Sequence, residues 1–310
     1  MPPLWEVHAF VCGYPGLRRT DTVPGAVQTP EETTLDVPGF ELAARVWGPP
    51  DGRRVLALHG WLDNAATFDG LAPRLPGCRI VALDMPGHGH SSHAAPGAVY
   101  PFIDFVAATH GALDALGWGT CTLMGHSLGS SVCATLAGTT PERVDRLVLL
   151  EGVGPLTTAA ADAPERLAGA LREQARKQAR PMTTYPDVAH VAKALAFSPS
   201  MLTPESIQTL LGRGLRPTEG GVQWRSDRRL RYASRSRLTE AQVLAFLGRI
   251  DCPTLLIVAK DGLRMPEAVM AARIAAITDL ESVEVPGHHH VHLDAPQTVA
   301  PAVATFLERG

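Results

Sequence analysis

The sequence lacks any long apolar run and any strong excess of charge of one sign. No segment of the 310 residues reaches the roughly 20 apolar residues that a membrane-spanning helix requires. The first residues, MPPLWEVHAFVCG, have no basic stretch of the kind that opens a secretory signal peptide, so we expect a cytoplasmic protein. The 28 basic and 31 acidic side chains give a net charge of −3, which argues against a general nucleic-acid binder.

Closely spaced cysteine pairs are also absent. None of the cysteines has CxxC spacing, and two of them lie in apolar runs. We therefore expect free buried thiols in a reducing compartment rather than a disulfide framework. The five are Cys12, Cys78, Cys121, Cys133 and Cys252.

The sequence does contain a regular alternation of short apolar strands with helices. Residues 41–48 alternate like an antiparallel strand, and later strands are expected in RRVLALHG, CRIVALDMPG, CTLMGHS, RLVLLEG, CPTLLIVAKDG and SVEVPG. Helical patterns follow most of them, which predicts a mostly parallel sheet covered on both faces. Residues 1–30, rich in Pro, Gly and Thr without a period, are expected to form a flexible extension.

The alternation is interrupted between residues 155 and 245. This stretch shows helical patterns, in APERLAGALREQARKQAR, MLTPESIQTLLGRG and LTEAQVLAFLGRI, but no convincing strand. It is too long for a structureless loop. We therefore expect a helical lid, residues 155–245, inserted into one core domain made of residues 31–154 and 246–310.

The strongest motif is GHSLG, from Gly125 to Gly129. It follows an expected strand and opens an expected helix, which is the context of a nucleophile elbow. The turn is so tight that the flanking positions must be glycine. The motif therefore predicts Ser127 as the nucleophile, with the backbone N–H of Leu128 directed at a developing oxyanion.

A second motif, HGW, ends an earlier strand. Acyl transfer needs two donors for the tetrahedral oxygen, and the N–H of Trp61 is the expected second donor. Four polar side chains within or next to these two motifs are expected to line the substrate pocket. They are His59, Asp63, Asn64 and His126.

A third motif, PGHHHVHLDAP, lies near the C-terminus. A serine nucleophile needs a general base, and histidine suits neutral pH. In proteins with a nucleophile elbow, the catalytic histidine comes last of the three triad residues in the chain. The candidates are His288, His289, His290 and His292. A zinc cluster is a second interpretation of this segment, but no acidic or cysteine partner with ligand spacing accompanies the histidines.

Together these motifs resemble those of the α/β-hydrolase superfamily, and most of all its serine hydrolase-like branch. The similar segments are LALHGWLDNAATF, VALDMPGHGHSS, TLMGHSLGSSV, RLVLLEGVGPL and the histidine segment, and the resemblance covers roughly residues 33 to 308. It implies a doubly wound, mostly parallel eight-stranded sheet with a lid. It also implies that the catalytic histidine stands three residues before His292, which is His289. Serine rather than aspartate at the elbow suits acyl transfer.

Two carboxylates compete for the role of the acid that orients the histidine. Glu151 ends the strand RLVLLEG, where some branches of the superfamily place their acid. Asp261 follows a later strand, but it comes one residue earlier than the usual family spacing. We slightly prefer Glu151.

These residues predict a serine hydrolase that acts on a carboxylic ester or related small acyl substrate, without a cofactor or a metal. Alternatives are a triad hydrolase of an amide, lactone or carbon–carbon bond, and a non-catalytic binding protein. The lid also carries a basic stripe, which we expect to be a solvated or salt-bridged surface rather than a site for nucleic acid or an anionic substrate. Its members are Arg213, Arg216, Arg225, Arg228, Arg229, Arg231, Arg235 and Arg237.

Overall fold

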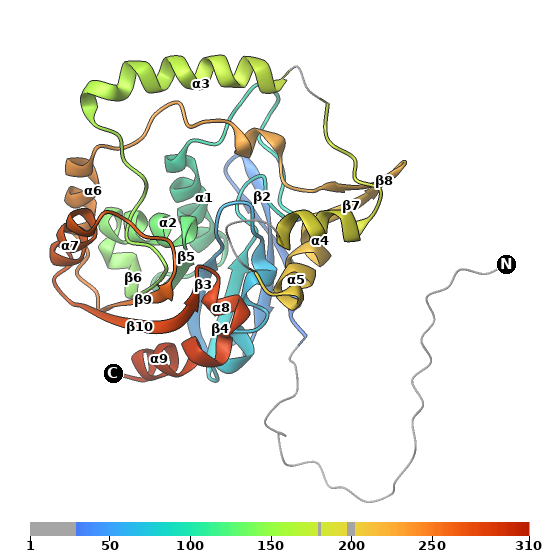
Figure 1. Ribbon diagram of the computed structural model, residues 1–310. Helices are drawn as coiled ribbons and strands as arrows, with labels where there is room; N and C mark the ends of the chain where they lie inside the picture. The colour runs from blue at the N-terminus through green and yellow to red at the C-terminus, as the bar shows by residue number, and fades with distance from the viewer. Residues whose placement is uncertain (1–28, 179–180, 197–201, 310) are drawn as a thin grey trace, which may run out of the picture.

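The computed structural model describes residues 29–178, 181–196 and 202–309 (Figure 1). Cys12 and nearly all of the expected N-terminal extension lie outside this part of the chain. The other four cysteines are buried and free of disulfides, as expected. Within the described residues, no helix is both long and apolar enough to cross a membrane.

The centre of the molecule is an eight-stranded sheet in the order β1-β2-β4-β3-β5-β6-β9-β10. The pairs β1–β2 and β2–β4 are antiparallel, and the remaining pairs are parallel. This arrangement confirms the expected fold class. The strands are β1 (Glu31–Val37), β2 (Phe40–Trp47), β3 (Arg53–Leu58), β4 (Cys78–Leu83), β5 (Cys121–His126), β6 (Val144–Leu150), β9 (Thr254–Asp261) and β10 (Leu280–His288).

The central strands are buried on both faces over most of their length, which explains their mainly apolar sequences. Along β3, Leu56 and Leu58 enter one hydrophobic core, while Val55 and Ala57 enter the other. Helices cover the two faces. The first face is covered by α1 (Phe102–Ala115), α2 (Leu128–Thr139), α6 (Glu240–Leu247) and α7 (Glu267–Ala276), and the second by α9 (Pro296–Glu308) and the 3₁₀ helix η1 (Ala65–Phe68).

The inserted segment contains the three expected helices and a feature that the sequence did not predict. The helices are α3 (Ala163–Gln178), α5 (Pro204–Gly214) and α6, joined by a further helix α4 (Val188–Ala196). The expectation that this segment holds no strand is wrong, because β7 (Leu215–Thr218) and β8 (Gly221–Trp224) form an antiparallel hairpin. Four residues per strand are too few to show a period-two pattern.

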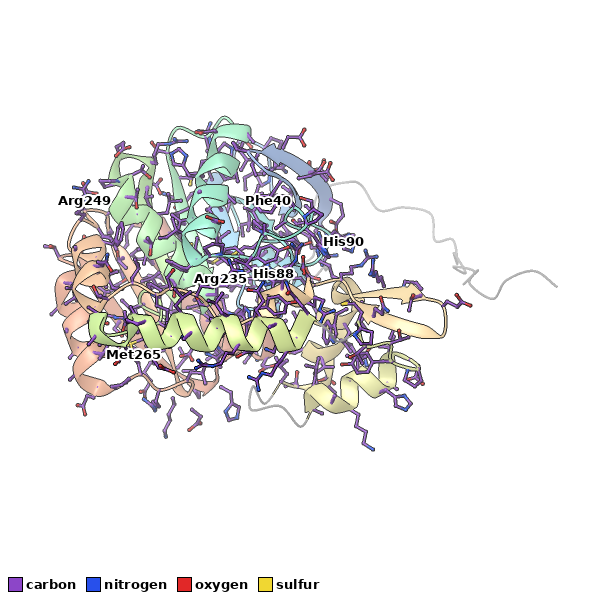
Figure 2. The ribbon with its side chains drawn as sticks, turned by 90° about the horizontal axis from the view of Figure 1, so that it is seen from above. Phe40, His88, His90, Arg235, Arg249 and Met265 are labelled. Atoms are coloured by element: carbon purple, nitrogen blue, oxygen red, sulfur yellow. The ribbon has the colours of Figure 1, made fainter. Side chains whose placement is uncertain are left out.

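The inserted segment is fixed to the core at several points. Buried Arg213 of α5 donates from Nε to Asp84 at 2.8 Å, beyond the end of β4, and from Nη1 to Glu32 of β1. Helix α6 packs on α2, and its Val243 belongs to the first core. Helix α3 lies along the outer side of the molecule (Figures 1 and 2). Within the inserted segment, the side chain of Arg235 donates to Gln174 of α3 at 2.6 Å.

Several arginines of the expected basic stripe are paired within the protein. Arg213 forms its ion pairs with Asp84 and Glu32, and Arg229 forms one with Asp227 at 2.6 Å. The guanidinium of Arg231 lies 5.9 Å from the centre of a tryptophan ring in β8. These contacts agree with the expected salt-bridged surface.

Candidate active site

The GHSLG motif forms a sharp turn between β5 and α2. Ser127 follows the last residue of β5 with φ 53° and ψ −108°, and α2 begins at Leu128. A Cβ on Gly125 would lie 2.3 Å from the Gly129 carbonyl carbon, and a Cβ on Gly129 would lie 2.1 Å from the Leu58 carbonyl oxygen. Only glycine fits at either position, so the two glycines let helix, turn and strand approach this closely.

Three non-glycine residues of the described chain have positive φ angles, and all three follow strands at the same edge of the sheet. They are Leu62 at 66°, Ser127 at 53° and Glu151 at 59°. They come after β3, β5 and β6, which are neighbours in the sheet. Such conformations cost about 1–3 kcal/mol each and concentrate at functional sites. The strained backbone therefore marks the loops that carry the expected oxyanion donor, nucleophile and acid.

Glu151 and His289 are brought together at this edge. Nδ1 of His289 lies 3.0 Å from Oε2 of Glu151, and the Glu151 side chain is only 2% exposed. The other carboxylate oxygen accepts a hydrogen bond from the backbone N–H of Ala259 in β9. A carboxylate held in this way fixes the hydrogen of His289 on Nδ1 and leaves Nε2 free to accept a proton.

Asp261, the competing candidate, lies apart from this pair. It is exposed at the end of β9. The contact with the histidine segment is made by its backbone carbonyl, which lies 3.4 Å from Nδ1 of His288.

The expected base lies close to the residue that precedes the expected nucleophile. The His289 ring centre lies 4.8 Å from that of His126, the residue before Ser127. Among the described residues, no hydrogen bond joins the Ser127 hydroxyl to His289. Catalytic contacts of this type are often loose without substrate.

The two expected oxyanion donors are available. Within the described part of the chain, neither the N–H of Trp61 nor that of Leu128 donates to an acceptor. Trp61 is 54% exposed, and its indole N–H donates to the carbonyl of Leu230 at 3.1 Å, which joins the turn after β3 to the inserted segment.

His59 and Asn64, two of the expected pocket residues, are enclosed by protein. Nε2 of His59 accepts from the N–H of Met85 at 3.0 Å, and its Nδ1 lies 2.7 Å from the Gly60 carbonyl. Burial lowers the pKa of His59 to about 4, so the ring is neutral. Asn64 caps η1 and donates to the carbonyl of Leu210 at 2.9 Å. Both side chains therefore connect segments of the protein in this structure.

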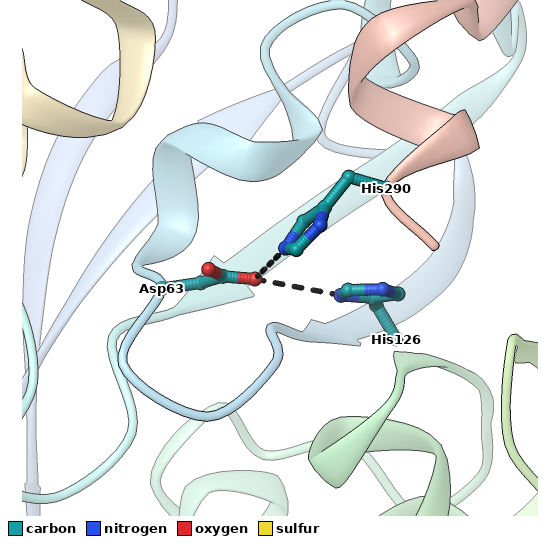
Figure 3. A group of neighbouring side chains, drawn as sticks. All are labelled: Asp63, His126 and His290. Carbon is teal, nitrogen blue, oxygen red and sulfur yellow. Dashed lines mark hydrogen bonds and ion pairs between the residues drawn. The ribbon is translucent and has the colours of Figure 1, made fainter. Parts of the chain in front are cut away.

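Asp63 and His126, the other two expected pocket residues, meet His290 in a buried cluster (Figure 3). Oδ2 of Asp63 lies 3.2 Å from Nε2 of His290 and 3.5 Å from Nδ1 of His126. Burial would raise the pKa of Asp63, but the charge of His290 and the hydrogen bond from that histidine hold the pKa of Asp63 well below its usual value. Burial opposes the protonation of His290, but Asp63 outweighs it and raises the pKa of that histidine.

The sequence did not predict this cluster, because 227 residues separate its acid from His290. The fourth histidine of the segment, His292, is fully buried, and its Nε2 lies 2.8 Å from the hydroxyl of Thr67 in η1. Burial lowers the pKa of His292 well below its usual value.

Comparison with known proteins agrees with this architecture. Residues 53–296 match the α/β hydrolase fold family. The chain is 34% identical over 290 residues to a serine hydrolase-like protein of Danio rerio, covering 89% of this chain and 88% of the relative. The crystal structure of a hypothetical protein of Pseudomonas aeruginosa PAO1 is 42% identical, with a TM-score of 0.84 and coverage of 89% and 98%.

A thioesterase domain from the curacin biosynthetic pathway is also similar, at 28% identity and a TM-score of 0.77, with coverage of 90% of this chain and all of that one. The family match spans more than half of the chain, and the Danio rerio relative aligns over nearly its whole length. The chain therefore belongs to the α/β-hydrolase superfamily, in its serine hydrolase-like branch.

Proposed function

We propose that this hydrolase cleaves a carboxylic ester or a related acyl substrate with a triad of Ser127, His289 and Glu151. The observation that carries the proposal is the 3.0 Å hydrogen bond between His289 and Glu151, which lies beside the strained turn at Ser127. The carboxylate, the imidazole and the serine then stand in the chain order and in the roles of a hydrolase triad.

The first half of the proposed reaction forms an acyl-enzyme. Nε2 of His289 takes the proton of the Ser127 hydroxyl as the oxygen attacks the acyl carbon. Glu151 accepts from Nδ1–H and stabilises the imidazolium that forms. The N–H groups of Trp61 and Leu128 stabilise the oxyanion of the tetrahedral intermediate. The intermediate collapses, and the alcohol leaves with the proton from His289.

The second half releases the acid. His289 takes a proton from water, which attacks the acyl carbon, and Ser127 leaves with that proton when the second tetrahedral intermediate collapses. The similarity to a thioesterase domain supports acyl transfer, because thioester cleavage follows the same covalent route. In this proposal His59 and Asn64 position the loops, and the segment 155–245 acts as the lid that sets substrate choice.

Labelling with a fluorophosphonate tests the proposal. The reagent should modify Ser127 alone, and a panel of p-nitrophenyl esters of graded chain length should then define the acyl pocket. Labelling without turnover of any ester would favour an amide, lactone or carbon–carbon bond as the substrate. Neither labelling nor turnover in a folded protein would favour a binding protein that keeps the hydrolase fold.

A further inference from the structure

Three buried side chains from distant segments converge in one cluster (Figure 3). Asp63 lies in the turn after β3, His126 ends β5 and His290 follows β10. Their side chains are 10%, 1% and 9% exposed, respectively. One ligand atom from each lies within 4.8 Å of the others. The proposed triad uses none of these three side chains.

The hydrogen bonding of His126 leaves one contact in this cluster unexplained. Its Nε2 lies 2.9 Å from the backbone carbonyl of His289. A carbonyl only accepts, so Nε2 carries the hydrogen, and in a neutral imidazole Nδ1 then presents a lone pair. That lone pair faces the carboxylate oxygen of Asp63 at 3.5 Å, and Nδ1 has no hydrogen-bond partner. Two buried acceptors that face each other call for a cation between them.

A glycine lies beside these two atoms. A methyl group on the Cα of Gly60 would lie 2.8 Å from Oδ2 of Asp63 and 2.8 Å from Nδ1 of His126. Any larger residue would therefore push into the gap that the two acceptor atoms border.

Two of the three distances between the ligand atoms fit a transition metal ion, and the third, between the two histidine nitrogens, is at most 4.8 Å. Zinc binds nitrogen and carboxylate oxygen at about 2.0–2.2 Å, so two ligands of a tetrahedral site are roughly 3.3–3.5 Å apart. Oδ2 of Asp63 lies 3.2 Å and 3.5 Å from the two ring nitrogens. The bond from Nε2–H of His126 to a backbone carbonyl is also the usual second contact of a metal-binding histidine. Imidazole ligands favour zinc over magnesium or calcium.

We propose that Asp63 Oδ2, His126 Nδ1 and His290 Nε2 form a binding site for a divalent transition metal ion of the Zn²⁺ class. The ion would replace the proton that Nε2 of His290 shares with Asp63, and that proton would leave to solvent. Water would complete the tetrahedral coordination.

An ion at this position would join the three loops of the proposed active site. His126 directly precedes Ser127, His290 directly follows His289, and Asp63 lies two residues after Trp61. The ion would take no part in the proposed acyl transfer. It would stabilise the folded chain, because a ligand that binds only the native state raises the free energy of unfolding.

Metal content and thermal unfolding of the full, untagged chain test this site without reference to hydrolysis. Protein stripped with a chelator and dialysed against ZnCl₂ should retain one zinc per chain, and its Tm should rise by several degrees. Asp63→Asn, His126→Gln and His290→Ala should each weaken zinc binding at least tenfold. His288→Ala, in the same segment but outside the cluster, is the matched control and should bind zinc like the wild type.

A measurement on the unmodified protein covers the case in which these variants fail to fold. Co²⁺ added to the wild type should give the intense visible absorption of a tetrahedral site, and one equivalent of Zn²⁺ should remove it. The proposal is wrong if the wild type takes up no stoichiometric metal, or if folded His126→Gln and His290→Ala bind zinc as tightly as the wild type. It is equally wrong if nitrogen NMR in the presence of zinc shows both ring nitrogens of His126 protonated. A proton on Nδ1 would then lie between His126 and Asp63, where the proposal places the metal ion.

Discussion

Nδ1 of His289 donates a hydrogen bond to Glu151 at 3.0 Å, although 138 positions separate the two residues in the sequence. The contact follows from the sheet order, in which β6 and β10 both flank β9. Glu151 leaves β6 with a left-handed φ of 59°, and its carboxylate reaches across the end of β9, where it also accepts from the N–H of Ala259. Its longer side chain suits this span better than an aspartate would.

Removal of the Glu151 charge should impair turnover without unfolding the protein. Glu151→Gln keeps the size of the side chain but no longer holds the hydrogen of His289 on Nδ1, so we expect kcat to fall by about 10³–10⁴. Asp261→Asn is the matched control and should cost much less, because Asp261 is exposed. If Asp261→Asn shows the larger loss in ester hydrolysis, Asp261 is the acid.

The histidine segment should contain a single general base. We expect His289→Ala to lower turnover nearly as much as loss of the nucleophile, because no other imidazole contacts Glu151 within the described residues. His288→Ala and His290→Ala should retain substantial ester hydrolysis. The rates of ester hydrolysis of the three variants, measured under the same conditions, test this assignment. If His288→Ala loses more activity than His289→Ala, His288 is the general base.

Ser127→Ala should abolish both fluorophosphonate labelling and ester turnover. In comparable triads the loss of the nucleophile costs about 10⁶ in turnover. Ser131→Ala, one helical turn along α2, removes a hydroxyl whose hydrogen bond among the described residues goes to the backbone carbonyl of Ser127, and this variant should still be labelled. Undiminished hydrolysis by Ser127→Ala would disprove the assignment of the nucleophile.

Much of the fold could be predicted from the sequence because the central strands are short and mostly apolar. Strands β3, β5 and β6 and the turn at Ser127 are local features, and the residues that form each of them are adjacent in the sequence. Strand β1 was not predicted, because much of it is exposed and its alternation is weak. The hairpin of β7 and β8 was missed because each strand has only four residues.

The site was less predictable wherever it depends on contacts between distant segments. The motifs placed Ser127 and the histidine segment, but two carboxylates remained as candidates for the acid. The hydrogen bond from His289 to Glu151 depends on the order of the strands and on the positive φ angle of Glu151. Neither can be predicted from a local sequence pattern. The meeting of Asp63 with His290 has the same origin, since the turn after β3 and the loop after β10 become neighbours only in the folded chain.

The glycine after Asp261 gives a test of how closely the carboxylate of Glu151 must be held. A Cβ on Gly262 would lie 2.1 Å from Oε2 of Glu151, the atom that bonds His289. Gly262→Ala should therefore displace the carboxylate and lower kcat by at least tenfold, with little change in KM. Gly119→Ala is the matched control, because a Cβ there has no atom within 4 Å. Equal kcat values for the two variants would show that the carboxylate does not need this placement.

The ion pair between Arg213 and Asp84 should be a major link between the inserted segment and the core. Asp84 is fully buried, and it also accepts from the N–H groups of Ala65 and His90. Arg213→Met would leave this carboxylate without its cation. Loss of one partner of a buried pair costs about 3–5 kcal/mol of unfolding free energy, so Tm should fall on the order of 10 °C.

An exposed ion pair within the inserted segment provides the control for that measurement. Arg172 and Glu165 of α3 are paired at 3.0 Å, but their side chains are 65% and 83% exposed. Arg172→Met should change the free energy of unfolding by no more than about 1 kcal/mol, because solvent screens such pairs. Calorimetry of both variants separates burial from the mere presence of a salt bridge. If Arg213→Met unfolds at the same temperature as Arg172→Met, the inserted segment is attached to the core mainly by its other contacts, such as the bond from Trp61 to Leu230.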